Sequence, residues 1–203
     1  MLPTVALVGR PNVGKSTLFN KLTKSRDALV ADVPGLTRDR RYGRCELNEH
    51  RVTLIDTGGL FGDEVLAKAL TQQTQLAVNE ADVVVLLLDG REGVTGADED
   101  VVSYLRREGV NFIPVINKVD GVNEHEALVE ISRFGFGEPL LISASHSRGL
   151  RALEEALLTA LQRCNAFDEA QEASEPEGIS VALVGRPNVG KSALFNRLVR
   201  KRI

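Results

Sequence analysis

The sequence predicts an α/β fold in which helices cover both faces of a mostly parallel, six-stranded sheet. Short apolar, β-rich runs alternate with segments of helical periodicity, which is typical of βαβ units. The run 81–89, with its continuous apolar stretch between Asp82 and Asp89, resembles a strand covered on both faces and indicates the middle of the sheet. A length of 203 residues with 43% hydrophobic content allows one domain with a real core and a remnant of another.

The apolar runs predict strands near 4–9, 42–47, 51–56, 82–89, 111–117 and 139–142. The helical periodicities predict helices near 15–22, 64–79, 97–108, 124–133 and 149–163. Only Asn48, Glu49 and His50 separate the second strand from the third, which is too short for a crossover helix. We therefore expect these two strands to form an antiparallel hairpin at one edge of the sheet.

An internal repeat defines the domain organisation. Residues 5–22 recur at 181–198 with two differences, Ala193 in place of Thr17 and Arg197 in place of Lys21. We expect a complete domain at 1–163 that folds alone, and the opening strand, loop and helix of a second such domain at 179–203. The stretch 164–178 has five acidic residues and no basic one, which predicts a flexible linker.

Composition argues against several classes of partner. No apolar run approaches the roughly 18 residues of a membrane span, and Met1 leads almost directly into the first strand, so we expect a cytoplasmic protein with no membrane partner. The mildly acidic first domain has no electrostatic footprint for nucleic acid, and we interpret the six basic residues of 179–203 as one face of a truncated helix. The two cysteines have no C-x-x-C spacing and the three histidines have no ligand partners at helical spacing, so we interpret all five as ordinary structural residues: Cys45, Cys164, His50, His125 and His146.

The loop between the first strand and the first helix carries the pattern G-x-x-x-x-G-K-S. Its glycines allow close approach of backbone N–H groups to phosphate oxygens at a helix N-terminus. Lys15 is expected to contact the β- and γ-phosphates, and the Ser16 hydroxyl to bind Mg²⁺. A glycine-rich turn without a ligand is the alternative. The expected phosphate-binding residues are Gly9, Arg10, Pro11, Asn12, Val13, Gly14, Lys15, Ser16 and Thr17.

The segment Asn117, Lys118, Val119 and Asp120, at the end of an apolar strand, indicates which base is bound. The Asp120 carboxylate can accept from guanine N1–H and the 2-amino group, donors that adenine lacks at those positions. Asn117 would donate to the other edge of the base and the Lys118 stem would pack on its ring. An Asx turn before Gly121 is the alternative. Backbone N–H groups of the segment Ser143, Ala144 and Ser145 are expected to reach guanine O6, and a plain helix entry is the alternative.

Two further segments complete the expected site. Asp56, Thr57, Gly58, Gly59 and Leu60 follow a strand, which would put Asp56 near Mg²⁺ and the Gly59 N–H beside the γ-phosphate. An ordinary turn at the strand end is the alternative. Thr37 lies in a polar segment broken by Pro34 and Gly35, a candidate switch loop whose Thr37 would complete the Mg²⁺ ligands.

These motifs, in this order, resemble the translation-factor-type GTPases of the Era-like branch, and the repeated phosphate loop resembles the Der (EngA) family of double-domain GTPases. The resemblance covers residues 1–198 and implies a P-loop GTPase fold, Mg²⁺-dependent GTP hydrolysis and assistance in assembling the large (50S) bacterial ribosomal subunit. It also implies that this chain lacks most of a second GTPase domain and a KH-like domain, through which most RNA contact would occur. The second phosphate loop should function only in a longer chain: Gly185, Arg186, Pro187, Asn188, Val189, Gly190, Lys191 and Ser192.

The expected chemistry departs from Ras-like GTPases at one position. Leu60 stands where a water-orienting Gln would be, and no catalytic general base is identifiable. The resemblance implies a K⁺ ion held by Asn12, which would stabilise charge on the phosphates, so K⁺ should stimulate turnover; Asn12 as a plain turn residue after Pro11 is the alternative. The expected catalytic residues are Lys15, Thr37, Gly59 and Asn12. A GTP-sensing interaction module with negligible hydrolysis is the second hypothesis, and an ATPase or kinase with the same phosphate loop is the third.

Overall fold

The structure is a computed structural model that describes residues 2–23, 41–57, 72–167 and 197. Contacts divide the chain into two compact units, residues 1–172 and 173–203. The strands and helices named below all lie in the first unit. The predicted domain limits at residues 163 and 179 stay predictions.

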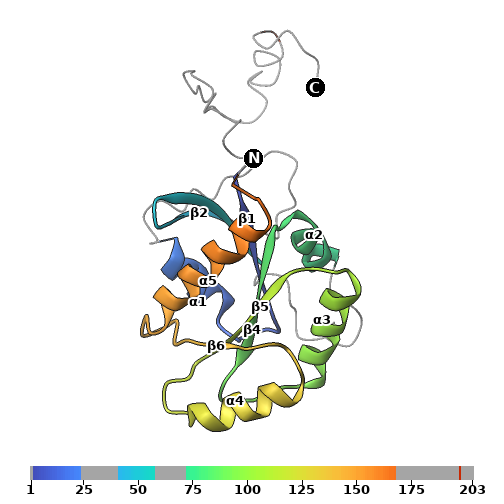
Figure 1. Ribbon diagram of the computed structural model, residues 1–203, viewed down its shortest axis with the longest axis vertical. Helices are drawn as coiled ribbons and strands as arrows, with labels where there is room; N and C mark the ends of the chain where they lie inside the picture. Colours follow the sequence, from blue (N-terminus) through green and yellow to red (C-terminus); the bar gives the residue numbers. More distant parts are fainter. Residues whose placement is uncertain (1, 24–40, 58–71, 168–196, 198–203) are drawn as a thin grey trace, which may run out of the picture. The chain divides into compact units, whose positions relative to one another are not determined.

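The sheet has six strands in the order β2-β3-β1-β4-β5-β6 (Figure 1). The strands are β1 (Thr4–Val8), β2 (Arg41–Leu47), β3 (His50–Asp56), β4 (Val83–Asp89), β5 (Phe112–Asn117) and β6 (Leu140–Leu141). β2 and β3 pair antiparallel at one edge, and the other pairings in this sheet are parallel. The predicted mostly parallel sheet with one antiparallel edge hairpin is therefore confirmed.

The hairpin turn is one residue shorter than the sequence suggests. Leu47 pairs with His50, so His50 belongs to β3 and only Asn48 and Glu49 form the turn. Both turn residues have positive φ, 43° and 72°. This is the two-residue hairpin geometry whose twist matches that of the strands, and it explains why such a short connection suffices.

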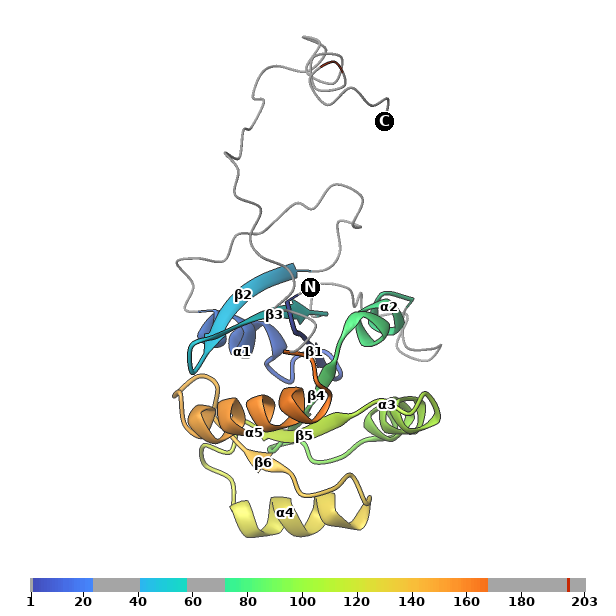
Figure 2. The same cartoon turned by 45° about the horizontal axis from the view of Figure 1, so that its top comes forward.

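Helices cover both faces of the sheet, as predicted. They are α1 (Lys15–Leu22), α2 (Gln72–Glu80), α3 (Gly96–Arg107), α4 (Glu124–Arg133) and α5 (Leu150–Arg163). Apolar residues of α1 and α5 share one core cluster, whereas those of α2, α3 and α4 belong to the clusters of the opposite face. Figure 2 separates α1 and α5, at the left, from α2 and α3, at the right. The predicted start of the second helix, 64–71, falls outside the described residues.

Strand β4 shows why the middle of the sheet is apolar up to Asp89, at the end of the strand. All seven of its residues are buried. Val83, Val85 and Leu87 pack in the cluster with α1 and α5, while the alternate residues of the strand pack in the clusters of the other face. Because side chains alternate along a strand, both sets must be apolar when both faces are covered.

The parallel strands run in the same direction, so their carboxyl ends lie together along one edge of the sheet, perpendicular to the outer-strand edge that the hairpin forms. Gly9, Asp56, Asp89 and Asn117 stand at or directly after the ends of β1, β3, β4 and β5. In open α/β sheets, ligands bind at this edge. The fold therefore gathers segments that lie far apart in the sequence.

Within residues 2–23, 41–57 and 72–167, no helix combines the length and the hydrophobicity that a membrane-spanning helix requires.

Candidate functional site

The phosphate loop joins β1 to α1 and closes around the side chain of Lys15. The Lys15 ammonium donates to the carbonyls of Gly9 and Arg10, both at 2.7 Å. Lys15 is the first residue of α1 and is 4% exposed. A hollow of about 260 Å³ opens beside it, at the helix N-terminus where N–H groups favour an anion, and is lined by Asn12, Gly14, Lys15, Ser16 and Thr17.

The charge of Lys15 is set by two opposing effects. Burial lowers the pKa of Lys15 from 10.5 to about 8, although the Asp56 carboxylate acts in the other direction. Asp56 ends β3 and is fully buried. At neutral pH the ammonium is therefore mostly protonated, in a place where an added phosphate would stabilise its charge.

Two glycines of this loop have no room for a side chain. A Cβ on Gly9 would overlap the Leu87 carbonyl of β4, and a Cβ on Gly14 would overlap Nδ2 of Asn117. Gly14 also has φ 99°, which L side chains rarely adopt. The close approach at Gly14 brings the phosphate loop directly against the segment that follows β5.

Asn117 ties three loops together. Its Nδ2 donates to the Val13 carbonyl at 2.8 Å, and its Oδ1 accepts from the Ala144 N–H at 2.9 Å. The side chain is 2% exposed. These bonds hold the phosphate loop and the loop after β6 at fixed positions around the end of β5.

The loop after β6 differs from expectation in its backbone. The Ala144 N–H donates to Asn117 Oδ1, and the Ser143 N–H donates to the Arg148 carbonyl at 3.0 Å. We expected both groups to point to guanine O6. Ser143 and Ala144 are buried, and a buried N–H group without a hydrogen-bond partner is costly. Both N–H groups therefore donate to acceptors of the protein itself. The group of Ser143 that contributes to the candidate site is its hydroxyl, which donates to Asp120.

Asp120 is held from two sides. The Ser143 hydroxyl donates to Oδ1 at 2.7 Å, and the Arg91 guanidinium pairs with Oδ2. The hydrogen bond from Ser143 lowers the pKa of Asp120, and Arg91 acts in the same direction, although desolvation opposes them. The carboxylate is therefore ionised and able to accept from a ligand.

Lys118 pairs with Asp89 at the end of β4. The Lys118 ammonium lies 2.6 Å from Asp89 Oδ2, and the Arg91 N–H donates to Asp89 Oδ1 at 2.9 Å. Burial alone would raise the pKa of Asp89, but these hydrogen bonds and the Lys118 charge leave it below its ordinary value. Lys118 has φ 65°, a left-handed backbone conformation that is uncommon for residues other than glycine.

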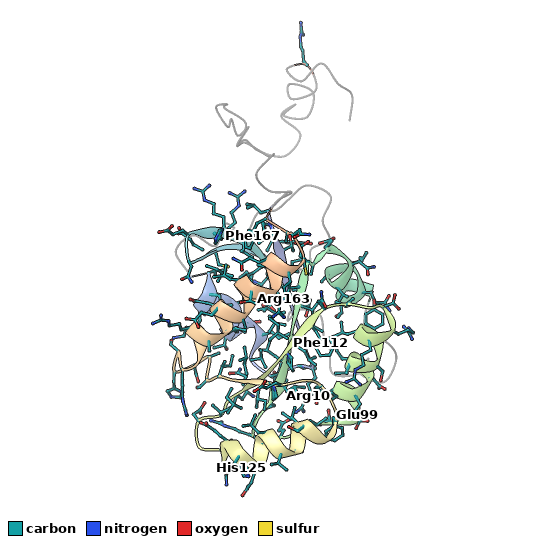
Figure 3. All side chains as sticks on the ribbon, viewed as in Figure 1. Arg10, Glu99, Phe112, His125, Arg163 and Phe167 are labelled. Carbon is teal, nitrogen blue, oxygen red and sulfur yellow. The ribbon has the colours of Figure 1, made fainter. Side chains whose placement is uncertain are left out.

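Arg10 turns to α3 instead of to the phosphate hollow. Its guanidinium lies 2.5 Å from Glu92 and 3.2 Å from the fully buried Asp98, and it donates to the Gly93 carbonyl. Figure 3 shows Arg10 near the first turn of α3, which carries Glu99. We expected Arg10 among the nucleotide-binding residues. The structure gives its side chain carboxylate partners on the protein, which compensate for its burial.

Other expected residues are placed as follows. The side chains of Val13 and Val119 are buried in the core, so only the backbone of these two residues faces the candidate site. The Thr57 hydroxyl donates to the Leu7 carbonyl at 2.8 Å and anchors β3 to β1. Asn12 has φ 64°, as a turn residue after Pro11 would, and its side chain is exposed beside the hollow. Thr37, Gly58, Gly59, Leu60 and the second phosphate loop, 185–192, lie outside the described residues.

Two residues of this arrangement, Asp89 and Arg91, are not among those predicted from the sequence. Asp89 could have been found, because an acidic residue that ends a central, otherwise apolar strand stands at the ligand-binding edge of the sheet. Arg91 gives no comparable signal. Its importance depends on the pairing with Asp120, which is 29 residues away in the chain.

Comparison with known proteins identifies the family. A family model described as "50S ribosome-binding GTPase" matches residues 4–118 and 180–203. Curated relatives named GTPase Der include that of Marinomonas sp. (strain MWYL1), 52% identical over 98% of this chain and 45% of the relative. The GTPase Der of Thioalkalivibrio sulfidiphilus (strain HL-EbGR7) is 50% identical over 98% of this chain and 43% of the relative. The chain therefore spans less than half the length of these relatives, and the resemblance to the Der family is confirmed.

Solved structures confirm the P-loop GTPase fold. A crystal structure of Era with MgGDPNP and a segment of 16S ribosomal RNA has a TM-score of 0.65 and 27% identity, over 90% of this chain and 59% of that one. A variant of Aquifex aeolicus Era bound to GDP and aluminium fluoride has the same TM-score and identity, over 98% of this chain and 65% of that one.

Proposed function

We propose, since this chain belongs to the 50S ribosome-binding GTPase family, that it binds guanine nucleotides and hydrolyses GTP. The observation that carries the proposal is the hydrogen bond from Asn117 to the Val13 carbonyl. It joins the phosphate loop to the segment suited to read the base, so the two halves of one nucleotide site are held at a fixed separation. A separate phosphate loop or a separate Asx turn would need no such bond.

The phosphate side of the proposed site is built by α1 and its loop. Lys15 places a positive charge at the hollow, and the first N–H groups of α1 add donors and the positive end of the helix dipole. Fixed donors of this kind stabilise the charge that develops on phosphate oxygens during transfer. The buried position of Lys15 strengthens this interaction, because little water screens it.

The base side of the proposed site depends on the ionised Asp120. Its carboxylate would accept from guanine N1–H and from the 2-amino group. Adenine offers no such pair of donors at those positions and would leave the carboxylate unsatisfied, a penalty of about 1–3 kcal/mol or more. Lys118 belongs to the same segment as Asp120, and its ammonium pairs with Asp89. The aliphatic stem of Lys118 would cover one face of the base.

Mg²⁺ fits the oxygen groups near Lys15. The Ser16 hydroxyl stands at the start of α1 and lines the hollow, and the Asp56 carboxylate is buried close enough to Lys15 to affect its pKa. Hydroxyl and carboxylate oxygens are ligands that Mg²⁺ prefers. Held by Ser16 and Asp56, Mg²⁺ would offset the negative charge of bound phosphates. Thr37 is our candidate for a third protein ligand.

The finer parts of the proposal rest on the sequence and the relatives. Leu60 cannot orient water, so we propose that K⁺ held by Asn12 supplies charge stabilisation and speeds turnover. From the name of the family we propose that the large ribosomal subunit or its assembly intermediates are the partner. A partner of that kind would be met in the cytoplasm.

Binding and turnover can be tested separately on the 203-residue chain. Calorimetric titration should show GDP binding and no measurable ADP binding, and Lys15→Ala should abolish the GDP signal because it removes the charge at the hollow. Single-turnover hydrolysis of GTP, with Mg²⁺ and K⁺ present, should then proceed in the wild type.

The outcomes separate the competing functions. Equal binding of ADP and GDP would favour an ATPase or kinase and refute the base assignment. GDP binding without hydrolysis would favour the GTP-sensing module. A matched control is Lys21→Ala, an exposed lysine on the same helix, which should leave binding unchanged.

A further inference from the structure

The turn after β4 holds the segment after β5 at several points. Asp89 accepts from the Lys118 ammonium at 2.6 Å, and the Gly90 N–H donates to the Asn117 carbonyl at 2.8 Å. The third residue of the turn, Arg91, reaches furthest along the segment. These contacts come from three consecutive residues, so the turn and the segment form one unit at the edge of the sheet.

Arg91 and Ser143 fix the same carboxylate. Arg91 pairs with Asp120 Oδ2 and also lies 3.4 Å from the Asp120 carbonyl, while the Ser143 hydroxyl holds Oδ1 at 2.7 Å. Rotation about the last torsion of an aspartate is otherwise soft. Because the two donors come from different loops, the carboxylate cannot rotate without losing one of them.

A fixed carboxylate plane matters for a ligand with two parallel donors. An ionised carboxylate has about four lone-pair sites, so Ser143 and Arg91 leave acceptor capacity on each oxygen of Asp120. Guanine presents two donors side by side and needs both oxygens in its own plane. Hypoxanthine, which lacks the 2-amino group, presents only one and can be satisfied by a carboxylate in many orientations.

We propose that Arg91 is a positioning residue that sets base specificity by holding Asp120 in the plane needed for two-donor recognition. The proposal rests on the guanine-nucleotide binding proposed above. Arg91 acts through Asp120 and its contribution is selective: it favours a base with a 2-amino group over one without. A guanidinium suits this role because it keeps its charge and its donors are rigidly directed.

The test compares GDP with inosine diphosphate, the hypoxanthine analogue. Their dissociation constants are measured by calorimetric titration for the wild type, Arg91→Ala and Arg91→Lys. Arg91→Ala should weaken GDP binding about tenfold and inosine diphosphate binding about threefold or less, so that the preference for GDP falls about threefold. Arg91→Lys keeps the charge but loses the rigidly directed donors, so it should recover only part of the preference.

Arg107→Ala is the matched control. Arg107 is also an exposed arginine paired with a carboxylate, that of Glu108 at 3.2 Å, but it lies at the far end of α3. It should change neither dissociation constant. Circular dichroism confirms that each variant is folded, and the exposure of Arg91, 55% of its side chain, makes unfolding an unexpected result.

Three results would overturn the proposal. Tighter GDP binding by Arg91→Ala would mean that Arg91 blocks the base position. Equal losses for the two nucleotides would mean that Arg91 contributes only general charge or local stability. Unchanged binding of both would mean that Ser143 alone suffices; in each of these cases the proposed GTPase function stands. If the wild type binds no GDP, the proposed function and this inference both fail.

Discussion

The buried ammonium of Lys15 should make the stability of the nucleotide-free protein depend on pH in the alkaline range. Burial lowers the pKa of Lys15 in the folded state from 10.5 to about 8. Below the folded pKa both states are protonated, and the folded state bears the full cost of burying the charge. Above the unfolded pKa both are neutral and the cost is gone. The free energy of unfolding should therefore gain this contribution as the pH rises from about 8 to 10.5.

The size of the effect follows from the two pKa values. A pKa lowered from 10.5 to about 8 corresponds to about 3 kcal/mol at neutral pH, where Lys15 is charged in both states. Between about pH 7 and about pH 9.5, about 2 kcal/mol of this cost should disappear. Lys15 is only 4% exposed, so solvent screening reduces the estimate little.

The assay compares urea unfolding of the nucleotide-stripped wild type with that of Lys15→Met. Methionine is an unbranched side chain close in length to lysine but carries no charge, so the stability of this variant lacks this dependence on pH. The stability of the variant relative to the wild type should be greatest near neutral pH and should fall by about 2 kcal/mol by about pH 9.5. Other groups that titrate in this range are common to both proteins and cancel in the difference.

Lys21→Met, an exposed position on the same helix, should show no such trend. A difference between the wild type and Lys15→Met that stays constant over this range would refute the reasoning. It would mean that the ammonium of the free protein is better solvated or better paired than the burial of Lys15 indicates.

Three further predictions concern the nucleotide. Asp120→Asn should weaken GTP binding by about tenfold or more and shift the preference to xanthine nucleotides, whose 2-oxo group accepts a hydrogen bond; unchanged GTP affinity would contradict the base assignment. Hydrolysis should be faster in KCl than in matched NaCl, and Asn12→Ala should remove that difference without changing nucleotide affinity; equal rates in both salts would instead favour a catalytic group supplied by a partner. Titration with GDP should give one site per chain, lost in Lys15→Ala and retained in Lys191→Ala, because residues 179–203 repeat the phosphate loop but not the segments of Asp56 and of Asn117 to Asp120 that complete the proposed site. A stoichiometry of two would show that the second loop also binds.

Much of the fold could be predicted because its signals are local. The apolar run of β4 and the short connection between β2 and β3 each restrict the chain within a few residues, and both predictions are confirmed. The identity of the turn residues was less predictable. His50 could belong to the turn or to β3, and the twist of the paired strands decides in favour of β3.

The candidate site was predictable in position but not in detail. The pattern from Gly9 to Ser16 and the segment from Asn117 to Asp120 follow strands, and parallel strands bring such segments to one edge of the sheet. The atoms that meet there could not be predicted. Arg10 can reach either a phosphate or a carboxylate, and the buried Asp98 at the start of α3 decides between them.

Periodicity and spacing along the chain are enough to predict the order of the elements, the end of the sheet at which the loops gather and the residue types in those loops. Which donor meets which acceptor depends instead on how the loops pack together in the folded protein. Asn117 donates a hydrogen bond to a carbonyl 104 residues away, and Asp120 is held by Arg91 and Ser143 from two other loops. Each polar group has several possible partners of similar strength, and only packing, which excludes water and leaves few of them within reach, selects among them.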